Sequence, residues 1–540
     1  MIKNNKIVYY MIMLIFIISC KSKDTSYYIN NEKMKNEKSG VYYEIFVRSF
    51  ADSNGDGIGD IKGIMLKLDK LKELGIEGIW LTPIFKSPSY HKYDVTDYYK
   101  IDPEYGTSDD LKNLVIEAHK RGIKIILDLP VNHTSVEHPW FKDIKDNVNS
   151  KYKEYYRISK KDDKSLNLKS FSMGHLSWVP LNDKELYYAI FWEGMPDLNF
   201  SNKKVRKEII DIGKYWIINS NIDGYRLDAA YHIYGKGEYP EKIDSQTENL
   251  SWWNEFRKNM QSVKPNVYLV GEVWSSTSQT ASYFNVFDSN FNFDISEKGI
   301  IEAISSGDGE IFGKRLSSIY NQYYSVAENY IDAPFLTNHD QNRLANTISD
   351  LKQQKLASSI LLTLPGNPFI YYGEELGMKG SKPDEEIREP YLWDENDNSK
   401  THWIDNKNNK IGIENYNIQH ENKNSLYNHY KLLLNLRKNN EILKYGNYKF
   451  VDLNNPKILA YERTYNKKSI IIIHNMSSEN INVDLVKKIN YYKILSLHDI
   501  ENGKLNIAGY TTAIFSIKKK KKRGSNESRN YMYRNRIING

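Results

Sequence analysis

The sequence predicts an α/β fold built on a (β/α)8 TIM barrel, with an inserted domain and a C-terminal sandwich. Between residues 41 and 372, eight apolar runs of strand length alternate with helical patterns. Four runs end in acids, histidines or an arginine, within DLPVNH, DGYRLDAAYH, GEVW and FLTNHD, which begin at Asp128, Asp223, Gly271 and Phe335. Because the carboxyl ends of barrel strands share one face, these side chains predict a catalytic site there.

The predicted barrel occupies residues 40–133 and 196–432. Its strands are Val41–Phe50, Ile76–Pro83, Ile123–Leu129, Gly224–Ala229, Val267–Glu272, Phe291–Ile295, Ala333–Thr337 and Pro368–Tyr372. Helical patterns cover Ile64–Leu74, Ser108–Arg121, Lys204–Ile218, Trp252–Val263 and Leu344–Leu362. Ser108 ahead of two acids is typical of a helix start, and Gly75 and Gly122 are typical of helix ends.

Two further folded units are predicted. Residues 134–195 separate the third strand from the next helix, which is too long for an ordinary βα loop and indicates a small inserted domain. After about Tyr430 the alternation gives way to extended apolar segments. These predict an antiparallel β-sandwich domain over residues 433–517. The basic segment 518–540 is expected to be disordered.

The amino terminus predicts export. Lys3 and Lys6 precede an uncharged stretch that ends at Cys20, the only cysteine. The stretch is too short for a comfortable membrane span, so residues 1–20 read as a signal and 21–39 as a linker. The segment resembles a bacterial lipoprotein signal, which implies a cell-surface or periplasmic protein whose only membrane attachment is a lipid anchor at Cys20. An ordinary secretory signal is the alternative, and a lone cysteine excludes an internal disulfide.

The charge distribution does not favour a nucleic-acid partner. The formal net charge is +7, but residues 518–540 carry nine basic side chains and one acid, so the rest of the chain is near neutral. The 42 Tyr and 10 Trp residues provide flat surfaces on which sugars can stack. We expect a carbohydrate-binding monomer.

The four strand-end segments resemble, in order and wording, the conserved regions of the α-amylase family of retaining glycoside hydrolases. The similarity runs from about Tyr42 to Ile517. Five further stretches support it: Asp52–Asp60, Tyr93–Tyr98, Met195–Asn199, Asn338–Arg343 and Tyr371–Glu375.

The resemblance implies a catalytic role for three carboxyls. Asp228 matches the nucleophile, Glu272 the general acid/base, and Asp340 the carboxylate that grips the sugar hydroxyls. Retaining hydrolysis needs the first two carboxyls about 5–5.5 Å apart. Arg226, two residues before Asp228, shares its strand face and would keep it ionised, whereas Glu272 has to stay protonated until it acts. The alternative is that Arg226 and Asp228 form only a structural ion pair.

The resemblance also implies substrate contacts. His133 and His339 match histidines that hydrogen-bond the sugar, and Tyr93 matches the aromatic platform beneath it. Arg343 matches a residue that pairs with Asp340. The alternative for the histidines is that they are ordinary satisfied polar groups at strand ends.

The loop Asp52–Asp60 spaces oxygen-bearing side chains at alternate positions between glycines, as Ca²⁺ loops do. The resemblance implies a Ca²⁺ site with ligands from Asp52, Asn54, Asp56 and Asp60 and the carbonyl of Ile58. The alternative is a glycine-rich turn without an ion. The resemblance leaves open whether a second Ca²⁺ site of the family exists near Asn132 and His232.

Two features address specificity. Ala229 after the nucleophile and the MPDLN segment at Met195–Asn199 resemble an intermediate amylase/neopullulanase group and favour α-1,4 glucans, namely starch, glycogen or maltooligosaccharides. Tyr231-His232 stands where many endo-acting amylases have Lys-His, so endo and exo action both stay open. The alternatives are an exo- or α-1,6-acting oligosaccharide glucosidase and a transglycosylase. A non-catalytic glycan-binding protein would have lost carboxylates that this chain retains.

Overall fold

The computed structural model describes residues 37–147, 149–235, 243–484, 491–495, 500–501 and 504–517. The predicted signal with Cys20, nearly all of the linker and the basic tail therefore lie outside the described residues. Within the described part, none of the helices combines the length and apolar character needed to cross a membrane.

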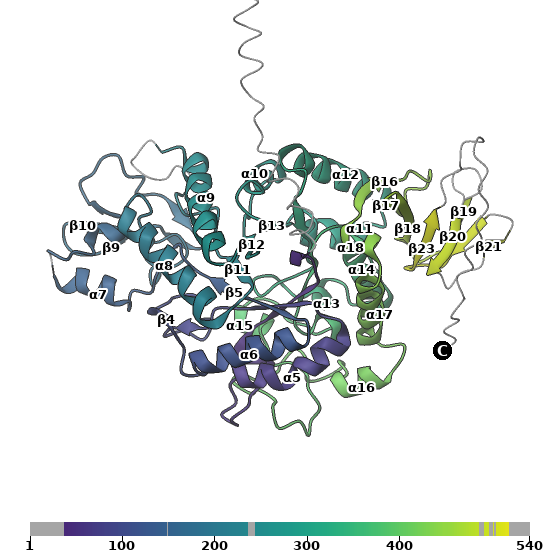
Figure 1. Ribbon diagram of the computed structural model, residues 1–540, viewed down its shortest axis with the longest axis horizontal. Coiled ribbons are helices and arrows are strands. Elements are labelled where there is room, and N and C mark those ends of the chain that lie inside the picture. The colour runs from purple at the N-terminus through teal and green to yellow at the C-terminus, as the bar shows by residue number, and fades with distance from the viewer. Residues whose placement is uncertain are drawn as a thin grey trace, which may run out of the picture. The chain divides into compact units, whose positions relative to one another are not determined.

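Eight parallel strands confirm the predicted barrel (Figure 1). Their order is β14-β13-β12-β11-β5-β2-β1-β15, and a parallel bridge between Phe335 and Phe369 joins the two ends. Tyr42, Trp80, Phe291 and Phe369 are among the side chains of a buried cluster contributed by these strands. The strands are β1 (Tyr42–Ile45), β2 (Gly78–Leu81), β5 (Lys124–Leu129), β11 (Gly224–Leu227), β12 (Tyr268–Gly271), β13 (Ser289–Phe291), β14 (Ile331–Ala333) and β15 (Phe369–Tyr371).

The observed strands are shorter than the predicted ones, and the differences are largest at β1, β13 and β14. The second half of the predicted first strand forms a helical turn, α4 (Val47–Phe50). Strands β13 and β14 each begin two residues before the predicted start. In β13 the reason is Ser289, a buried polar residue whose Oγ accepts a hydrogen bond from Tyr268 at 2.8 Å. Because this polar side chain is hydrogen-bonded, it can be buried in the barrel, and it interrupts the apolar pattern from which the start of the strand was predicted.

Helices cover the barrel, and local sequence sets where they begin and end. Helix α5 (Ile61–Leu74) begins at Asp60, whose side chain accepts from the Gly63 N–H, and ends at Gly75 with φ of 109°. The predicted helix 344–362 is divided into α13 and α14. The other barrel helices are α6 (Ser108–Lys120), α8 (Lys203–Ser220), α9 (Ser245–Val263), α10 (Thr277–Tyr283), η2 (Ser296–Ile301), α11 (Glu302–Ser306), α12 (Gly309–Val326), α13 (Leu344–Thr347), α14 (Leu351–Thr363), η3 (Glu374–Leu376) and α15 (Asp384–Ile387).

The long connection after β5 contains secondary structure of its own. A three-stranded antiparallel sheet has the order β6-β10-β9 around Trp178, Leu186 and Tyr188. An antiparallel bridge between His133 and Asp197 ties its ends together. The elements are α7 (Pro139–Asp146), η1 (Lys153–Tyr155), β6 (Ile158–Lys160), β7 (Phe171–Ser172), β8 (His175–Leu176), β9 (Trp178–Pro180) and β10 (Glu185–Tyr188). A separate pair, β3 (Phe85–Lys86) with β4 (Asp97–Ile101), holds the loop that carries Tyr93.

Two antiparallel sheets follow the barrel, in the orders β16-β17-β18-β23-β20 and β19-β22-β21. Residue 433, the predicted start of the sandwich, lies inside helix α17, and the first strand begins at Asn447. The elements are α16 (Tyr416–Glu421), α17 (Leu426–Lys438), α18 (Glu441–Tyr445), β16 (Asn447–Phe450), β17 (Ile458–Tyr465), β18 (Lys468–Asn475), β19 (Ile481–Asp484), β20 (Tyr491–Leu495), β21 (Ile500–Glu501), β22 (Lys504–Ile507) and β23 (Thr512–Ile517).

Candidate active site

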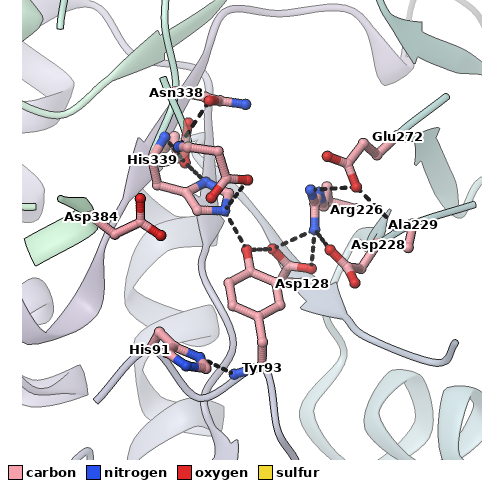
Figure 2. A network of polar contacts seen from close by, with 12 residues as sticks. His91, Tyr93, Asp128, Arg226, Asp228, Ala229, Glu272, Asn338, His339 and Asp384 are labelled. Atoms are coloured by element: carbon pink, nitrogen blue, oxygen red, sulfur yellow. Dashed lines mark hydrogen bonds and ion pairs between the residues drawn. The ribbon is translucent and has the colours of Figure 1, made fainter. Parts of the chain in front are cut away.

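Adjacent strand ends bring the predicted catalytic side chains together (Figure 2). Strands β11 and β12 pair in parallel with Leu227 opposite Gly271, so the next residues, Asp228 and Glu272, lie side by side. Arg226 precedes them on β11 and is only 1% exposed. The register of two neighbouring strands therefore determines that these two carboxyls meet.

One guanidinium lies at the centre of this group, which we call the Arg226 cluster: Arg226, Asp128, Asp228 and Glu272. Nη1 of Arg226 contacts Asp128 Oδ1 at 2.9 Å and also makes a short contact with Asp228 Oδ1. Nη2 contacts Glu272 Oε2 at 3.0 Å. Because Asp228 and Glu272 contact the two terminal nitrogens of one planar group, they are close enough to flank a common bond.

The Arg226 cluster has more carboxyls than cations. Burial raises the pKa of Asp228 and of Glu272, and the Arg226 charge opposes both shifts. Burial likewise raises the pKa of Asp128 to about 7. One cation cannot neutralise three buried carboxylates, so the cluster favours keeping a proton.

Asp128 begins the first strand-end segment, DLPVNH, but the sequence analysis predicted no role for it. Its Oδ2 accepts hydrogen bonds from Trp80 Nε1 at 3.2 Å and from Tyr93 Oη at 2.9 Å. Its place in DLPVNH, at the end of a buried strand, was the signal that could have identified it.

A second group, the Asp340 cluster, consists of Asp340, His339, Arg388 and Glu44. Asp340 Oδ1 lies 3.0 Å from Arg388 Nη2, and its Oδ2 lies 3.2 Å from His339 Nε2. Burial raises the pKa of Asp340, but His339 and Arg388 outweigh that effect and hold it well below its usual range. Burial lowers the pKa of His339, whereas Asp340 and Glu44 raise it to about 10. Asp340 is therefore ionised beside a cationic His339.

Tyr93 connects the two clusters. Its hydroxyl lies 2.9 Å from Asp128 Oδ2 and 2.7 Å from His339 Nε2. Its ring stacks on the His339 ring with centroids 5.5 Å apart and planes 11° from parallel. The Tyr93 ring, which is the predicted sugar platform, is therefore held at its hydroxyl by Asp128 and His339 and on one face by the His339 ring.

His133 is 2% exposed, and neither ring nitrogen makes a hydrogen bond within the described residues. Burial lowers its pKa to about 4, so the ring is neutral. Its ring lies edge-on to Phe191 at 5.4 Å. A neutral imidazole offers one donor and one acceptor, which suits a sugar hydroxyl.

The predicted pairing of Arg343 with Asp340 is wrong. Arg343 is 1% exposed, and it donates to the carbonyls of Ile387 and Tyr372, each at 2.7 Å. Arg388 pairs with Asp340 instead. The family resemblance assigned the pairing to Arg343, whereas Arg388 is 48 residues from Asp340 in a segment that carried no recognised motif.

The predicted Ca²⁺ loop is ordered by its own acids. Asp52 accepts from the N–H groups of Asn54, Gly55 and Gly57, at 2.7 to 2.8 Å. Asp60 accepts from Ser53 and also caps helix α5. No group of three or more acidic, histidine or cysteine side chains that could hold a metal ion lies within the described residues. The donor types, carboxylate, amide and carbonyl oxygen, nevertheless fit Ca²⁺.

Comparison with known proteins agrees with this geometry. Residues 44–446 match the family described as Alpha amylase, catalytic domain, and residues 458–514 match the Alpha-amylase SusG C-terminal domain. The chain is 42% identical to Alpha-amylase 3 of Dictyoglomus thermophilum, over 89% of this chain and 93% of that protein. It is 31% identical to an oligo-1,6-glucosidase of Bacillus cereus, over 89% and 99%.

A solved structure shows the same fold. The α-amylase from H. orenii superposes with a TM-score of 0.82 at 42% identity, covering 89% of this chain and all of that one. The two family models together span the barrel that carries both clusters and most of the C-terminal sheets. The chain therefore belongs to the α-amylase family of glycoside hydrolases.

Proposed function

We propose that this enzyme cleaves α-1,4-glucosidic bonds in starch, glycogen or maltooligosaccharides with retention of configuration. The observation that carries the proposal is the contact of Asp228 and Glu272 with two nitrogens of one buried guanidinium. Retaining glycosidases require two carboxyls that flank one bond from fixed positions.

The Arg226 cluster can run both steps at constant charge. In the first step an Asp228 oxygen bonds to the anomeric carbon while Glu272 protonates the leaving oxygen. Asp228 loses its charge in the covalent ester as Glu272 becomes a carboxylate. In the second step Glu272 takes a proton from water, the water oxygen bonds to the anomeric carbon, and Asp228 leaves as a carboxylate. The summed charge of Asp228 and Glu272 beside Arg226 is the same before and after each step. This limits the free energy needed to reorganise the surrounding polar groups.

The Asp340 cluster would hold the sugar in the cleaved position. An ionised Asp340 accepts hydrogen bonds from two hydroxyls, and these strengthen as positive charge develops on the ring. His339, being cationic, donates, whereas neutral His133 can donate or accept. Tyr93 supplies the apolar face beneath the ring.

The preference for α-1,4 linkage rests on the higher identity to the protein named Alpha-amylase 3, together with Ala229 and the MPDLN segment at Met195–Asn199. The oligo-1,6-glucosidase relative keeps an oligosaccharide-acting glucosidase as the second candidate. Transglycosylation would share the same covalent step and differ only in the acceptor.

A time course of products from starch and defined maltooligosaccharides, followed by chromatography and NMR, tests the proposal. We expect first-formed products in the α-anomeric form and no release from isomaltose. β-Anomeric products would overturn the retaining mechanism, and cleavage of isomaltose would favour the oligosaccharide glucosidase. Transfer products that exceed hydrolysis products would favour the transglycosylase.

We also propose that the loop Asp52–Asp60 binds Ca²⁺ through Asp52, Asn54, Asp56, Asp60 and the Ile58 carbonyl. The ion would tie the end of β1 to the start of α5, a structural role without a step in catalysis. Chelation is expected to lower the melting temperature by about 1–3 °C, as loss of about 1–2 kcal/mol would in a domain of this size. An unchanged melt together with no calcium by elemental analysis contradicts the site.

Export and anchoring at Cys20 form a third proposal, supported by the lipoprotein-like sequence of the first 20 residues. In the native host, the protein should fractionate with membranes, and Cys20→Ser should release it or leave it unprocessed. A wild-type protein found only in the soluble fraction contradicts the anchor. A single mass by light scattering, equal to one chain, would support a monomer.

A further inference from the structure

The residue after the proposed nucleophile has an unusual backbone. Ala229 has φ of 48°, in the left-handed region that costs an L-residue about 1–2 kcal/mol. Its N–H donates to Glu272 Oε2 at 2.8 Å. Strained backbone beside a reacting group is a reason to look for function.

Strand geometry explains why this N–H is available. The Asp228 N–H points to the carbonyl of Leu129 on one side, at 3.4 Å, and N–H groups alternate sides along a strand, so that of Ala229 points toward the end of β12. The left-handed turn at Ala229 then carries the chain away. The N–H is therefore left for the Glu272 side chain and is not used by the sheet ladder.

The two oxygens of Glu272 are not equivalent. Oε2 receives both the Ala229 N–H and the Arg226 Nη2–H, at 2.8 and 3.0 Å. Oε1 has no hydrogen-bond partner among the described residues, and Figure 2 shows both contacts on one oxygen. The side chain keeps 13% of its surface exposed.

We propose that Ala229 is a positioning residue, whose N–H, with Arg226, holds Oε2 of Glu272 so that the transferable proton lies on Oε1. This inference rests on the proposed acid/base role of Glu272. An amide N–H and a guanidinium N–H cannot accept a hydrogen bond, so a proton on Oε2 would face two donors. A proton on Oε1, which makes no hydrogen bond to the described residues, can pass to the leaving oxygen as the bond from that oxygen to the anomeric carbon breaks.

The same two donors stabilise what remains after transfer. When the Oε1–H bond breaks, its electron pair stays on Glu272, and the carboxylate charge is shared with Oε2. The Ala229 N–H and Arg226 then hydrogen-bond a charged acceptor, which strengthens both contacts. Ala229 therefore fixes the direction of the proton and supports the product of its transfer.

Replacement of Ala229 by lactic acid tests this directly, because the backbone ester keeps the methyl group and replaces the N–H donor by an ester oxygen that cannot donate. Loss of a donor to the carboxylate raises the pKa of Glu272, so the alkaline limb of kcat/KM should move up by about one pH unit. The kcat on maltoheptaose should fall about tenfold. An aryl maltoside whose leaving group needs no proton should lose several-fold less.

Ala229→Gly is the matched control, because it keeps the N–H and removes only the cost of the left-handed conformation. Its alkaline limb should stay at the wild-type pH. The inference is overturned if the ester leaves the limb in place, or if both substrates slow equally.

The unmodified chain provides a second readout should the ester chain fail to fold. Labelling with ¹³C-Asp and ¹⁵N-Ala selects two Asp–Ala amides, those of Ala229 and Ala333. The Ala333 amide should also titrate, because it follows the buried carboxyl of Asp332, so the diagnostic signal is the one whose pH dependence changes in Glu272→Gln. If neither signal responds to Glu272→Gln, the inference fails. Full activity of Glu272→Gln on maltoheptaose would instead remove the proposed function itself.

Discussion

The two clusters of the active site differ in their balance of cations and carboxyls. In the Arg226 cluster one guanidinium serves three buried carboxyls, and the pKa of each carboxyl is raised. In the Asp340 cluster His339 and Arg388 both face Asp340, and its pKa is held low. A surplus of carboxyls keeps a proton available for transfer, whereas two cations in contact with one carboxylate keep it ionised for binding.

The largest expected effect comes from removing the nucleophile of the Arg226 cluster. Asp228→Asn keeps the shape and neutralises the reacting oxygen, so kcat on maltoheptaose should fall by about 10⁴-fold or more. Steady-state kinetics give the loss, and circular dichroism should show an unchanged fold. More than a trace of activity in the folded variant would defeat the assignment of Asp228.

Substitutions at two buried arginines form a matched pair, because Arg388 contacts Asp340 and Arg343 does not. Arg388→Lys replaces a group that reaches Asp340 and Asp384 with a single ammonium, so kcat/KM should fall about 10- to 100-fold. The buried hydrogen bond from Arg388 to the His339 carbonyl is lost as well, so the unfolding free energy should also fall by about 1–3 kcal/mol.

Arg343→Lys should cost a similar amount, about 1–3 kcal/mol of unfolding free energy, because buried carbonyls lose donors, but with a smaller effect on kcat/KM because Arg343 does not contact Asp340. Denaturant melts and kinetics on both variants make the comparison. A larger loss of kcat/KM at Arg343 than at Arg388 would contradict the role of Arg388 as the partner of Asp340.

A smaller effect on kcat/KM is expected from a change at Tyr93, which contacts both clusters. Tyr93→Phe keeps the ring stacked on His339 but removes the hydroxyl shared with Asp128 and His339. We expect about a tenfold loss of kcat/KM, the value of roughly one hydrogen bond to charged groups. Equal activity on maltoheptaose would show that the two clusters act independently.

The pH profile should reflect the contrast. Activity needs Asp228 ionised and Glu272 protonated, and the pKa of each is raised, so both limbs of kcat/KM should lie above the range of ordinary carboxyls. The rate rises with pH as Asp228 ionises and falls as Glu272 loses its proton. The two limbs are macroscopic properties of the pair. An alkaline limb at the pH of an exposed Glu would contradict a raised pKa for Glu272.

The sequence by itself determined the barrel, because continuous apolar runs of strand length between helical patterns leave few other ways to bury them. It also placed Asp228 and Glu272 at strand ends, since local sequence decides where each strand stops. Only the tertiary structure showed that Arg226 serves Asp128 and Glu272 as well as Asp228, and that Arg388 holds Asp340. Such contacts join residues far apart in the chain, and their protonation depends on burial and on the charges that folding gathers around them. The left-handed turn at Ala229 belongs to the same class, because alanine carries no local signal for that conformation.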